Sequence, residues 1–542
     1  MKAKFIVVTG GVLSGLGKGV VTSSIGNLLK AQGYKVTAIK LDPYINVDAG
    51  TMRPTEHGEV WVTEDGGETD QDLGNYERFL DTNVMKNHSI TTGQVYNTVI
   101  QKERNLEYNG QCVEVIPHIP LEIKRRILEV TKQTQADFVL LEVGGTVGDY
   151  QSILYLEAMR ALKRELKDLL YVHVVYLPVP GNIGEMKTKP AQHSIRFLNE
   201  AGIQPDYIIA RSTKPIDDTR REKFSFLCNV DTSSVFAAPD VDNIYRIPLV
   251  FEQQGLDKHI LNKFGLRYKK NKNKLWKSLI KKINMLKQEV NIGIIGKYFD
   301  VGDFTLEDSY ISVIEAVKHA AWANNVKAKI QWINAKDFEK DPKKIETLQQ
   351  YHGLIVPGGF GSSGVEGKIK AVQYAREHKI PYLGLCYGLQ MAVIEFARNV
   401  CGLKDAHTTE FNPHTKNPVV IILEGQKKLL EQKQYGASMR LGTYEALLKK
   451  ESMVSKLYKS SHAKERHRHR YEVNPEYHST LEQHGLMLSG MSPDGKLVEY
   501  IELPHHPFFV ATQAHPEFTS RPLRPNPLFF GFLEAAKKKL KE

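Results

Sequence analysis

The feature that most constrains the fold is a glycine-rich loop between an apolar run and a helical pattern near the amino terminus. Residues 4–9 are mostly apolar, residues 10–19 (GGVLSGLGKG) contain five glycines, and a helical pattern runs from 18 to 31. Small residues allow backbone amides to close on phosphate oxygens, and the start of a helix favours negative charge. We therefore predict a strand, a phosphate-binding loop and a helix, with Lys18 reaching a terminal phosphate.

This loop departs from the Walker pattern at two positions. Val12 stands where the first glycine belongs, and Gly19 replaces the Ser or Thr that would hold Mg²⁺. Mg²⁺ prefers hard oxygens, typically one or two carboxylates with phosphates and water. We predict that Asp72 and Glu142 serve instead, because Glu142 ends an apolar run and α/β folds bind ligands at the carboxyl ends of strands. A second lysine, Lys40, also lies at a predicted strand end.

Apolar runs alternate with helical patterns along most of the chain, which is typical of a parallel α/β sheet. A Lys- and Asn-rich stretch that contains one short basic helix interrupts the alternation, which then resumes. The predicted fold is α/β, with two doubly wound parallel-sheet domains. Their predicted bounds are 1–266 and 291–542, with a linker at 267–290.

The composition excludes several classes of protein. With 542 residues, 41% hydrophobic and 25% charged, the chain is neither collagen-like, nor disordered, nor a small disulfide scaffold. It has four cysteines without a C-x-x-C pair and no apolar run of membrane-spanning length, so we expect a reducing, cytoplasmic location. The net charge of +11 suits nucleotides, but no basic run alternates with aromatic residues, so neither nucleic acid nor membrane is an expected partner.

The second half carries the pattern of a thiol nucleophile. Cys386 lies in GLCYG (384–388), between an apolar run and a helical run, and this G-x-C-x-G turn lifts the thiol to a helix start that favours thiolate. QAHPE (513–517) places His515 and Glu517 two residues apart, so both side chains point the same way on an extended segment. We predict that Glu517 orients His515, that His515 serves Cys386, and that PGGFG (357–361) supplies amides for an oxyanion.

These motifs resemble two joined families. GLCYG with QAHPE is similar to the class I glutamine amidotransferases, and this domain behind a P-loop-like synthetase domain resembles the CTP synthase family over essentially the whole chain. The segments that carry the resemblance are GGVLSGLGKG (10–19), KLDPYINVD (40–48), GGTVGD (144–149), EMKTKPAQHS (185–194), MRLG (439–442) and ERHRHRYEVN (465–474).

The resemblance implies a glutamine-hydrolysing ligase. ATP would phosphorylate the 4-oxygen of UTP with Mg²⁺ on Asp72 and Glu142, Cys386 would release ammonia from L-glutamine, and ammonia passing near His57 would displace phosphate to give CTP. It also implies activation by GTP near Arg440, inhibition by CTP, and a homotetramer, with filaments in some members.

The resemblance assigns further binding residues by position. The ATP side comprises Gly15, Leu16, Gly17, Lys18, Gly19, Val20, Lys40, Asp72, Asp240 and Val241. The UTP/CTP side comprises Ser14, Asp149, Tyr150, Gln151, Lys187, Thr188, Lys189, Pro190, Ala191, Gln192 and Lys223. The glutamine pocket comprises Gly359, Tyr387, Gly388, Leu389, Gln390, Glu410 and Arg470.

Three departures and two alternatives accompany this interpretation. Gln151 replaces a usual Glu, which bears on CTP inhibition, Tyr387 replaces a common Leu, and Pro239 is atypical beside the adenine segment. Another P-loop ligase coupled to a glutaminase, similar to the cobyrinate amidases, is the alternative enzyme. A nucleotide-sensing scaffold without turnover is the non-enzymatic alternative.

Overall fold

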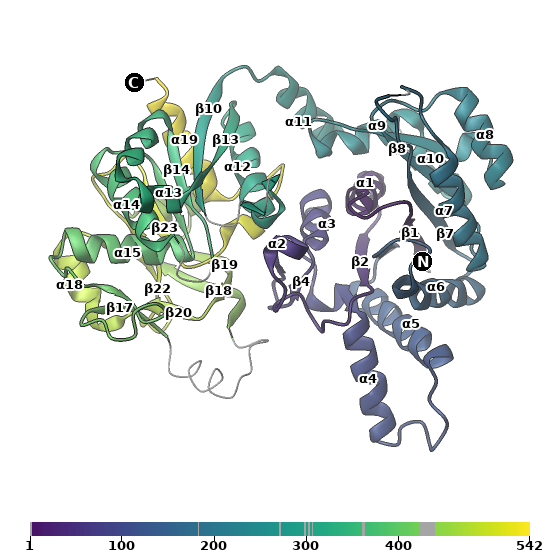
Figure 1. Cartoon of the computed structure of the whole chain (residues 1–542), viewed down its shortest axis with the longest axis horizontal. Coiled ribbons are helices and arrows are strands. Elements are labelled where there is room, and N and C mark those ends of the chain that lie inside the picture. The colour runs from purple at the N-terminus through teal and green to yellow at the C-terminus, as the bar shows by residue number, and fades with distance from the viewer. Residues whose placement is uncertain are drawn as a thin grey trace. The chain divides into compact units, whose positions relative to one another are not determined.

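The computed structural model describes residues 3–182, 184–269, 273–296, 300–301, 304–305, 307–359, 364–422 and 439–541 (Figure 1). The chain forms two compact units. The first contains Met1–Ala49 and Gln71–Ile280, and the second contains Gly50–Asp70 and Lys281–Glu542.

The described part of the first unit is built on a sheet of seven parallel strands. In spatial order these are β5 (Ser89–Thr91), β2 (Val36–Asp42), β6 (Phe138–Val143), β1 (Lys4–Gly10), β7 (Leu169–Tyr176), β8 (Tyr207–Ser212) and β9 (Val235–Pro239). Its helices are α1 (Lys18–Ala31), α3 (Asp72–Leu80), α4 (Thr92–Arg104), α5 (Val115–Thr134), α6 (Ile153–Glu165), α7 (Lys189–Glu200), α8 (Asp218–Cys228), α9 (Ile247–Gln254) and α10 (Leu256–Lys263). Helix α11 (Lys274–Met285) leads into the second unit.

Alternation along the strands divides the first unit's core into two layers. Val7 and Leu141 pack into the cluster formed with α5 and α6. The neighbouring residue Leu140 faces α1, where a Cβ on Gly26 would lie 2.9 Å from its Cδ1 atom. Because successive side chains on a strand point to opposite faces, fully buried strands read as continuous apolar runs. For this reason the apolar runs in the sequence predicted the positions of these strands.

The second unit contains a mixed sheet of nine described strands. In spatial order these are β13 (Lys327–Asn334), β10 (Glu289–Gly296), β14 (Gly353–Val356), β15 (Tyr382–Leu385), β23 (Phe509–Thr512), β22 (Val498–Glu502), β21 (Met487–Met491), β18 (Arg440–Leu448) and β19 (His462–His469). The first five are parallel and the last four antiparallel. The predicted α/β class is confirmed, and the antiparallel half of this sheet is an addition that the sequence did not indicate.

Smaller sheets and helices complete the described part of the second unit. The small sheets consist of β16 (His407–Thr408), β17 (Pro418–Ile422) and β20 (Tyr471–Val473), of β11 (Asp300–Val301) and β12 (Phe304–Thr305), and of β3 (Trp61–Val62) and β4 (Glu68–Thr69). The helices are α2 (Pro54–His57), α12 (Ile311–Ala323), α13 (Ala335–Lys340), α14 (Val365–Glu377), α15 (Tyr387–Asn399), α17 (Met453–Tyr458), α18 (His478–Gln483) and α19 (Pro527–Lys539). Helices α14 and α15 cover one face of the parallel strands, and α12 and α19 cover the other (Figure 1).

Residues 50–70 come from the amino-terminal half of the sequence but belong to the second unit. Trp61 packs edge-on against Phe518 with ring centroids 4.9 Å apart, and Thr443 N donates a hydrogen bond of 2.9 Å to Glu64 O. The Glu59 carboxylate accepts a hydrogen bond of 3.0 Å from Ser312 N at the start of α12. This segment is therefore packed and hydrogen-bonded as part of the second unit. Among the helices that the structure describes, none combines the length and apolar character required of a membrane span.

We predict that truncating Phe532 on α19 destabilises the second unit. Phe532 is fully buried, and it fits against Gly353, where a Cβ would lie 2.6 Å from its ring. Phe532→Ala should lower the free energy of unfolding by about 3–5 kcal/mol through lost burial and a cavity. The matched control Phe530→Ala removes a ring that is 36% exposed on the same helix, and it should cost about 1 kcal/mol or less. Urea unfolding followed by tryptophan fluorescence measures this, because Trp61, Trp322 and Trp332 lie in the second unit. Equal losses in the two variants would contradict this packing.

Candidate active site

The predicted phosphate loop lies between β1 and α1, as expected. Gly15 and Gly17 have positive φ values of 68° and 83°, which glycine adopts without strain. Val12 stands where the Walker pattern has glycine. Its φ of 86° lies in the left-handed region, which a residue with a side chain rarely adopts. Lys18 Nζ donates a hydrogen bond of 2.7 Å to Gly145 O, across the open side of the loop.

The structure explains why Gly19 stands where a hydroxyl residue usually lies. A Cβ on residue 19 would lie 2.8 Å from Asp72 Cγ and would overlap a carboxylate oxygen. Asp72, the first residue of α3, therefore occupies the space that a Ser or Thr side chain would need. The absence of a hydroxyl side chain at position 19 and the presence of the Asp72 carboxylate therefore depend on each other.

Asp72 and Glu142 converge on Lys40. Lys40 Nζ donates to Asp72 and, over 3.1 Å, to Glu142 Oε1, while Tyr76 Oη donates to Glu142 Oε2 over 2.5 Å. Burial raises the pKa of Glu142, and the nearby charge of Asp72 adds to the increase, so that it reaches about 7. Burial also opposes ionisation of Asp72, but the Lys40 charge outweighs it and lowers the pKa of that carboxyl.

This donor set fits Mg²⁺. The buried carboxyl group of Glu142 and the half-buried carboxylate of Asp72 repel each other and offer hard oxygens, which a divalent cation with nucleotide phosphates would use. Among the described residues no group of three or more His, Cys, Asp or Glu side chains is placed to bind a metal, so phosphate oxygens would complete the coordination.

Residues expected on the ATP side line a pocket beside the loop. Its lining includes Gly17, Val20, Asp240 and Val241, together with Pro239, Ile244, Ile247 and Arg211. Arg211 was missed by the sequence analysis. It pairs with Asp240 and donates a hydrogen bond of 3.3 Å to Leu16 O, so it joins the loop to the pocket wall. Its position near the end of β8 is the signal that could have found it.

Most of the residues expected to bind UTP or CTP lie on α7 or beside it. Lys189, Pro190 and Ala191 form its first turn, and a Cβ on Gly148 would lie 3.1 Å from the Phe197 ring, which places the Asp149–Gln151 loop beside this helix. Tyr150 is 93% exposed. Gln192 Nε2 donates a hydrogen bond of 2.9 Å to Thr188 Oγ1.

Basic side chains surround Glu185 near the same helix. Lys187 Nζ lies 2.7 Å from Glu185 Oε2 and lowers the pKa of that carboxyl, and Arg220 and Lys223 contribute to the decrease. Ser14 is exposed in the phosphate loop. The structure thus brings Lys187 and Lys223 together around one carboxylate, a cluster of cations that suits a nucleotide phosphate.

Cys386 occupies the predicted turn between β15 and α15. Its φ and ψ values of 50° and −96° are unusual for a residue with a side chain, as a nucleophile elbow requires. A Cβ on Gly384 would lie 2.8 Å from Ala511 Cβ, and one on Gly388 would overlap Val356 O. The two glycines of G-x-C-x-G are therefore needed where the turn passes between neighbouring strands.

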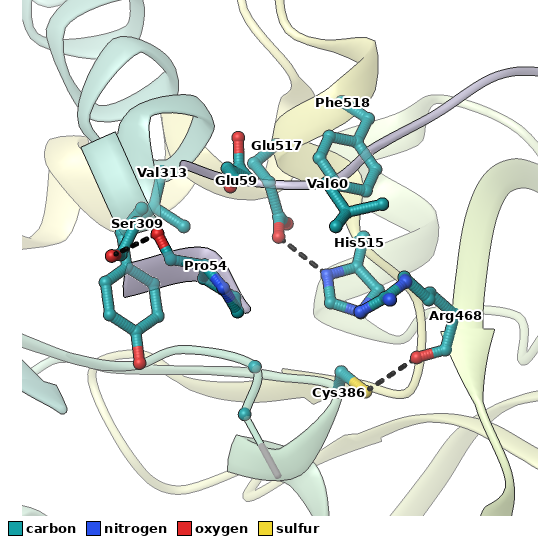
Figure 2. Close-up of a pocket in the computed structure, with 13 residues that line it drawn as sticks. Pro54, Glu59, Val60, Ser309, Val313, Cys386, Arg468, His515, Glu517 and Phe518 are labelled. Carbon is teal, nitrogen blue, oxygen red and sulfur yellow. Dashed lines mark hydrogen bonds and ion pairs between the residues drawn. The ribbon is translucent and has the colours of Figure 1, made fainter. Parts of the chain in front are cut away.

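His515 and Glu517 complete the expected constellation (Figure 2). Glu517 Oε1 lies 2.7 Å from His515 Nδ1, and His515 faces Cys386. Burial lowers the pKa of His515, but the charge of Glu517 and then that of Cys386 outweigh it and raise the pKa to about 10. The imidazole is therefore a cation at neutral pH. Gln513, whose Nε2 lies 3.6 Å from Cys386 Sγ, is a further contact that the sequence analysis missed.

Strand β19 carries the motif ERHRHR as an alternating pattern. Arg466 Nη1 donates to Val62 O over 2.9 Å, and Arg468 Nε donates to Glu68 Oε1 over 2.8 Å, so the arginine face holds residues 50–70. The backbone of the same strand contacts the reactive residues, because His515 N donates to Arg466 O over 2.7 Å. Cys386 Sγ lies 3.9 Å from Arg468 O.

Most of the residues expected to bind glutamine line one pocket next to the thiol. Gly359, Tyr387, Gln390, Glu410 and Arg470 share it with Cys386, His469 and Tyr471. Gly388 and Leu389 lie behind it in α15, where the Gly388 carbonyl accepts a hydrogen bond of 2.9 Å from Tyr382 Oη. Of the expected oxyanion segment, residues 360 and 361 lie outside the described residues.

A second cavity also opens on Cys386, and it encloses about 580 Å³ including space open to solvent. Pro54, Glu59 and Val60 from residues 50–70 form one side, and Tyr310, Phe518 and Arg468 contribute to the rest (Figure 2). His57, expected along an ammonia passage, lies on the same segment with Nδ1 3.7 Å from Asp70 Oδ2. Arg440, expected near an activator, is largely buried and paired with two carboxylates, Glu472 and Glu499.

Comparison with known proteins decides the family. A model of the CTP synthase N-terminus matches residues 4–266, and a model of the class I glutamine amidotransferases matches residues 305–535. CTP synthases from Methanococcus maripaludis and Carboxydothermus hydrogenoformans are 49% and 51% identical over 540 and 537 residues, covering 98–99% of this chain and 99% of each relative. The chain belongs to the CTP synthase family.

Family membership places a synthetase domain and a glutamine amidotransferase domain in one chain, the combination of a glutamine-hydrolysing ligase. The CTP synthase match to residues 4–266 favours this reading over a cobyrinate amidase-like ligase. A solved glutaminase domain of the Trypanosoma brucei CTP synthase, with bound acivicin, is 38% identical with a TM-score of 0.42, covering 46% of this chain and 94% of that chain.

We predict that Glu517→Gln moves the basic limb of the pH profile of glutamine hydrolysis to lower pH. His515 must be protonated to give a proton to departing ammonia, so activity should fall as pH rises through its pKa of about 10. Removing the Glu517 charge lowers that pKa, by about 1 unit or more for a directly contacting carboxylate. Measurement of kcat/KM for glutamine between neutral and alkaline pH tests this, with the exposed Glu534→Gln as control. A basic limb that stays in place in Glu517→Gln would show that the pair does not govern it.

Proposed function

We propose that this chain makes CTP from UTP, ATP and L-glutamine through two half-reactions, one served by residues of each unit. The observation that carries the proposal is that Cys386, His515 and Glu517 meet beside a pocket lined by residues expected for glutamine, in a chain of the CTP synthase family. The remaining steps follow from the chemistry of the residues described above.

In the glutaminase half-reaction the Cys386 thiolate attacks the amide carbon of glutamine. A carbon–sulfur bond forms, the carbon–nitrogen bond breaks, and His515 gives its proton to the leaving ammonia. Water then hydrolyses the thioester to glutamate with His515 acting as base, which restores the thiolate. The backbone amides of Gly359 and Tyr387 would stabilise the oxyanion, because both residues line the pocket next to Cys386.

In the synthetase half-reaction the γ-phosphoryl group of ATP moves to the 4-oxygen of UTP, and ammonia then attacks the ring carbon and expels phosphate. Lys18 and Lys40 supply positive charge beside the phosphate loop. Asp72 and Glu142 would hold Mg²⁺, which supplies charge stabilisation for the transferring phosphoryl group when bound. The pocket beside Arg211 and Asp240 would take the adenine.

Ammonia released into bulk water would be mostly protonated near neutral pH and no longer nucleophilic. The cavity between Cys386 and the wall formed by Pro54 and Val60 supports an internal exit that begins at the thiol. His57 on the same segment would lie along this exit.

The finer expectations for regulation and assembly also belong to this proposal. These are GTP as activator, CTP as inhibitor, a homotetramer and a cytoplasmic location. The four cysteines support the last of these, because all are free thiols.

We predict that Cys386→Ala separates the two half-reactions. Glutamine-dependent CTP formation should fall by ~10³-fold or more, because the nucleophile is lost. CTP formation from ammonium salts should remain within about twofold of the unchanged protein, since the synthetase residues lie in the other unit. Cys401→Ala, a half-buried thiol outside both cavities, is the control. Loss of both activities in Cys386→Ala, with unchanged thermal stability, would refute this division of labour, and ¹⁵N-amide glutamine that leaves no label in CTP would refute the proposed function.

We predict that Gly19→Ser, which restores the usual Walker hydroxyl residue, harms rather than helps synthesis. The added side chain would displace the Asp72 carboxylate. Ammonia-dependent CTP formation should therefore fall about tenfold or more, because charge stabilisation of the transferring phosphoryl group is weakened. Ala31→Ser adds the same hydroxyl at the half-buried last residue of the same helix, far along α1 from Asp72, and should leave the rate unchanged. Glutamine hydrolysis should be unaffected in both variants. A Gly19→Ser protein with full synthetase activity would contradict the placement of Asp72.

A further inference from the structure

A closed ring of buried polar side chains lies beside the glutamine pocket. Arg440 on β18 donates from Nη2 to Glu499 Oε1 on β22 over 2.6 Å and from Nη1 to Glu472 Oε1 on β20 over 3.4 Å. The side chain of Arg440 is 9% exposed, and those of both glutamates are 1% exposed. A buried cation paired with two carboxylates on different strands ties those strands together.

Two histidines of β19 close the ring. His467 Nδ1 and His469 Nε2 lie 2.9 Å apart, so one ring nitrogen donates to the other. The outer nitrogens face the two carboxylates, with His467 Nε2 3.6 Å from Glu499 Oε2 and His469 Nδ1 3.5 Å from Glu472 Oε1. We call these five side chains the Arg440 ring.

The Arg440 ring adjoins the short segment of chain that lines the glutamine pocket. Its members His469 and Glu472 flank Arg470 and Tyr471 along the chain, and both flanked residues line the pocket next to Cys386. Gln390 Nε2 donates a hydrogen bond of 3.0 Å to Tyr471 O from the other side of that pocket. The ring therefore holds both ends of the turn 469–472, at the point where the chain leaves the large sheet for the small one.

We propose that Arg440 is a positioning residue for glutamine binding: through Glu472 and Glu499 it fixes the turn 469–472, which presents Arg470 and Tyr471 to the substrate. This inference rests on the proposed glutaminase function. Without the guanidinium, two carboxylates would be left buried without their shared cation, and the turn would shift as they separated or gained a proton. Burial already raises the pKa of Glu472 to about 8 against the opposing effect of Arg440.

This role differs from the contact with a nucleotide activator that the family resemblance implies for Arg440. The guanidinium stacks on the Tyr444 ring, with its carbon 4.3 Å from the ring centroid, and it is enclosed by the two carboxylates. From this position it acts on the glutamine pocket through the protein interior.

The test compares Arg440→Gln with the charge-balanced double variant Arg440→Gln/Glu499→Gln in glutamine hydrolysis. The single variant should raise KM for glutamine about tenfold or more and change kcat by less than about threefold, because the thiol and imidazole are held by other contacts. The double variant should recover most of the KM, since the excess buried charge is gone. Lys464→Gln, on β19 with an exposed side chain, should change neither constant.

Three further measurements separate the alternatives. GTP titration should give an unchanged half-activation concentration in Arg440→Gln, and a shift there with unchanged KM would overturn the proposal in favour of a nucleotide contact.

His467→Gln, on the opposite side of the ring, should raise KM in the same way, which keeps the test valid if Arg440→Gln unfolds. An unchanged KM in His467→Gln, or a double variant no better than the single, would overturn it. CTP formation from ammonium salts should persist in every variant, and its absence in the unchanged protein would mark failure of the proposed function instead.

Discussion

One extended strand, β19, makes three sets of contacts around Cys386, through its backbone, its arginines and its histidines. Its backbone accepts a hydrogen bond from His515 N and lies against Cys386 Sγ, its arginines hold residues 50–70, and its histidines face buried carboxylates. The two-residue period of a strand makes this possible, because alternate side chains serve opposite faces while the backbone stays free to contact a third partner. Cys386, His515 and residues 50–70 are therefore all positioned by contacts with one strand.

Charge balance governs the phosphate loop in the first unit. Glycine at position 19 and Asp72 at the start of α3 are complementary, since the carboxylate fills the volume that a hydroxyl side chain would take. Lys40 then holds Asp72 and Glu142 close together despite their repulsion. The arrangement keeps two hard-oxygen donors in place, Glu142 at the end of β6 and Asp72 at the start of α3, and it would favour the binding of the proposed metal–nucleotide complex.

Much of the fold and part of the site followed from local patterns. The strands at residues 4–10, 36–42 and 138–143 were found because buried parallel strands read as apolar runs. The turn around Cys386 was found because a nucleophile elbow needs small residues at fixed spacing, and His515 and Glu517 because two residues on an extended segment share a direction. Gln513 and Arg468 were missed, because a single polar residue within a longer motif has no distinguishing local pattern. Arg211 was missed although it lies near the end of β8, because one strand-end residue does not show which distant segment it will contact.

The sequence by itself determined the two α/β halves, the phosphate loop and the thiol–imidazole–carboxylate set, because each depends on residues close together in the chain. Only the tertiary structure decided that residues 50–70 join the second unit, that Asp72 replaces a hydroxyl beside Gly19, and that Arg440 lies between Glu472 and Glu499. These arrangements join segments tens to hundreds of residues apart. They depend on how buried charges and side-chain volumes match one another when the whole chain packs. Local sequence patterns therefore do not predict them.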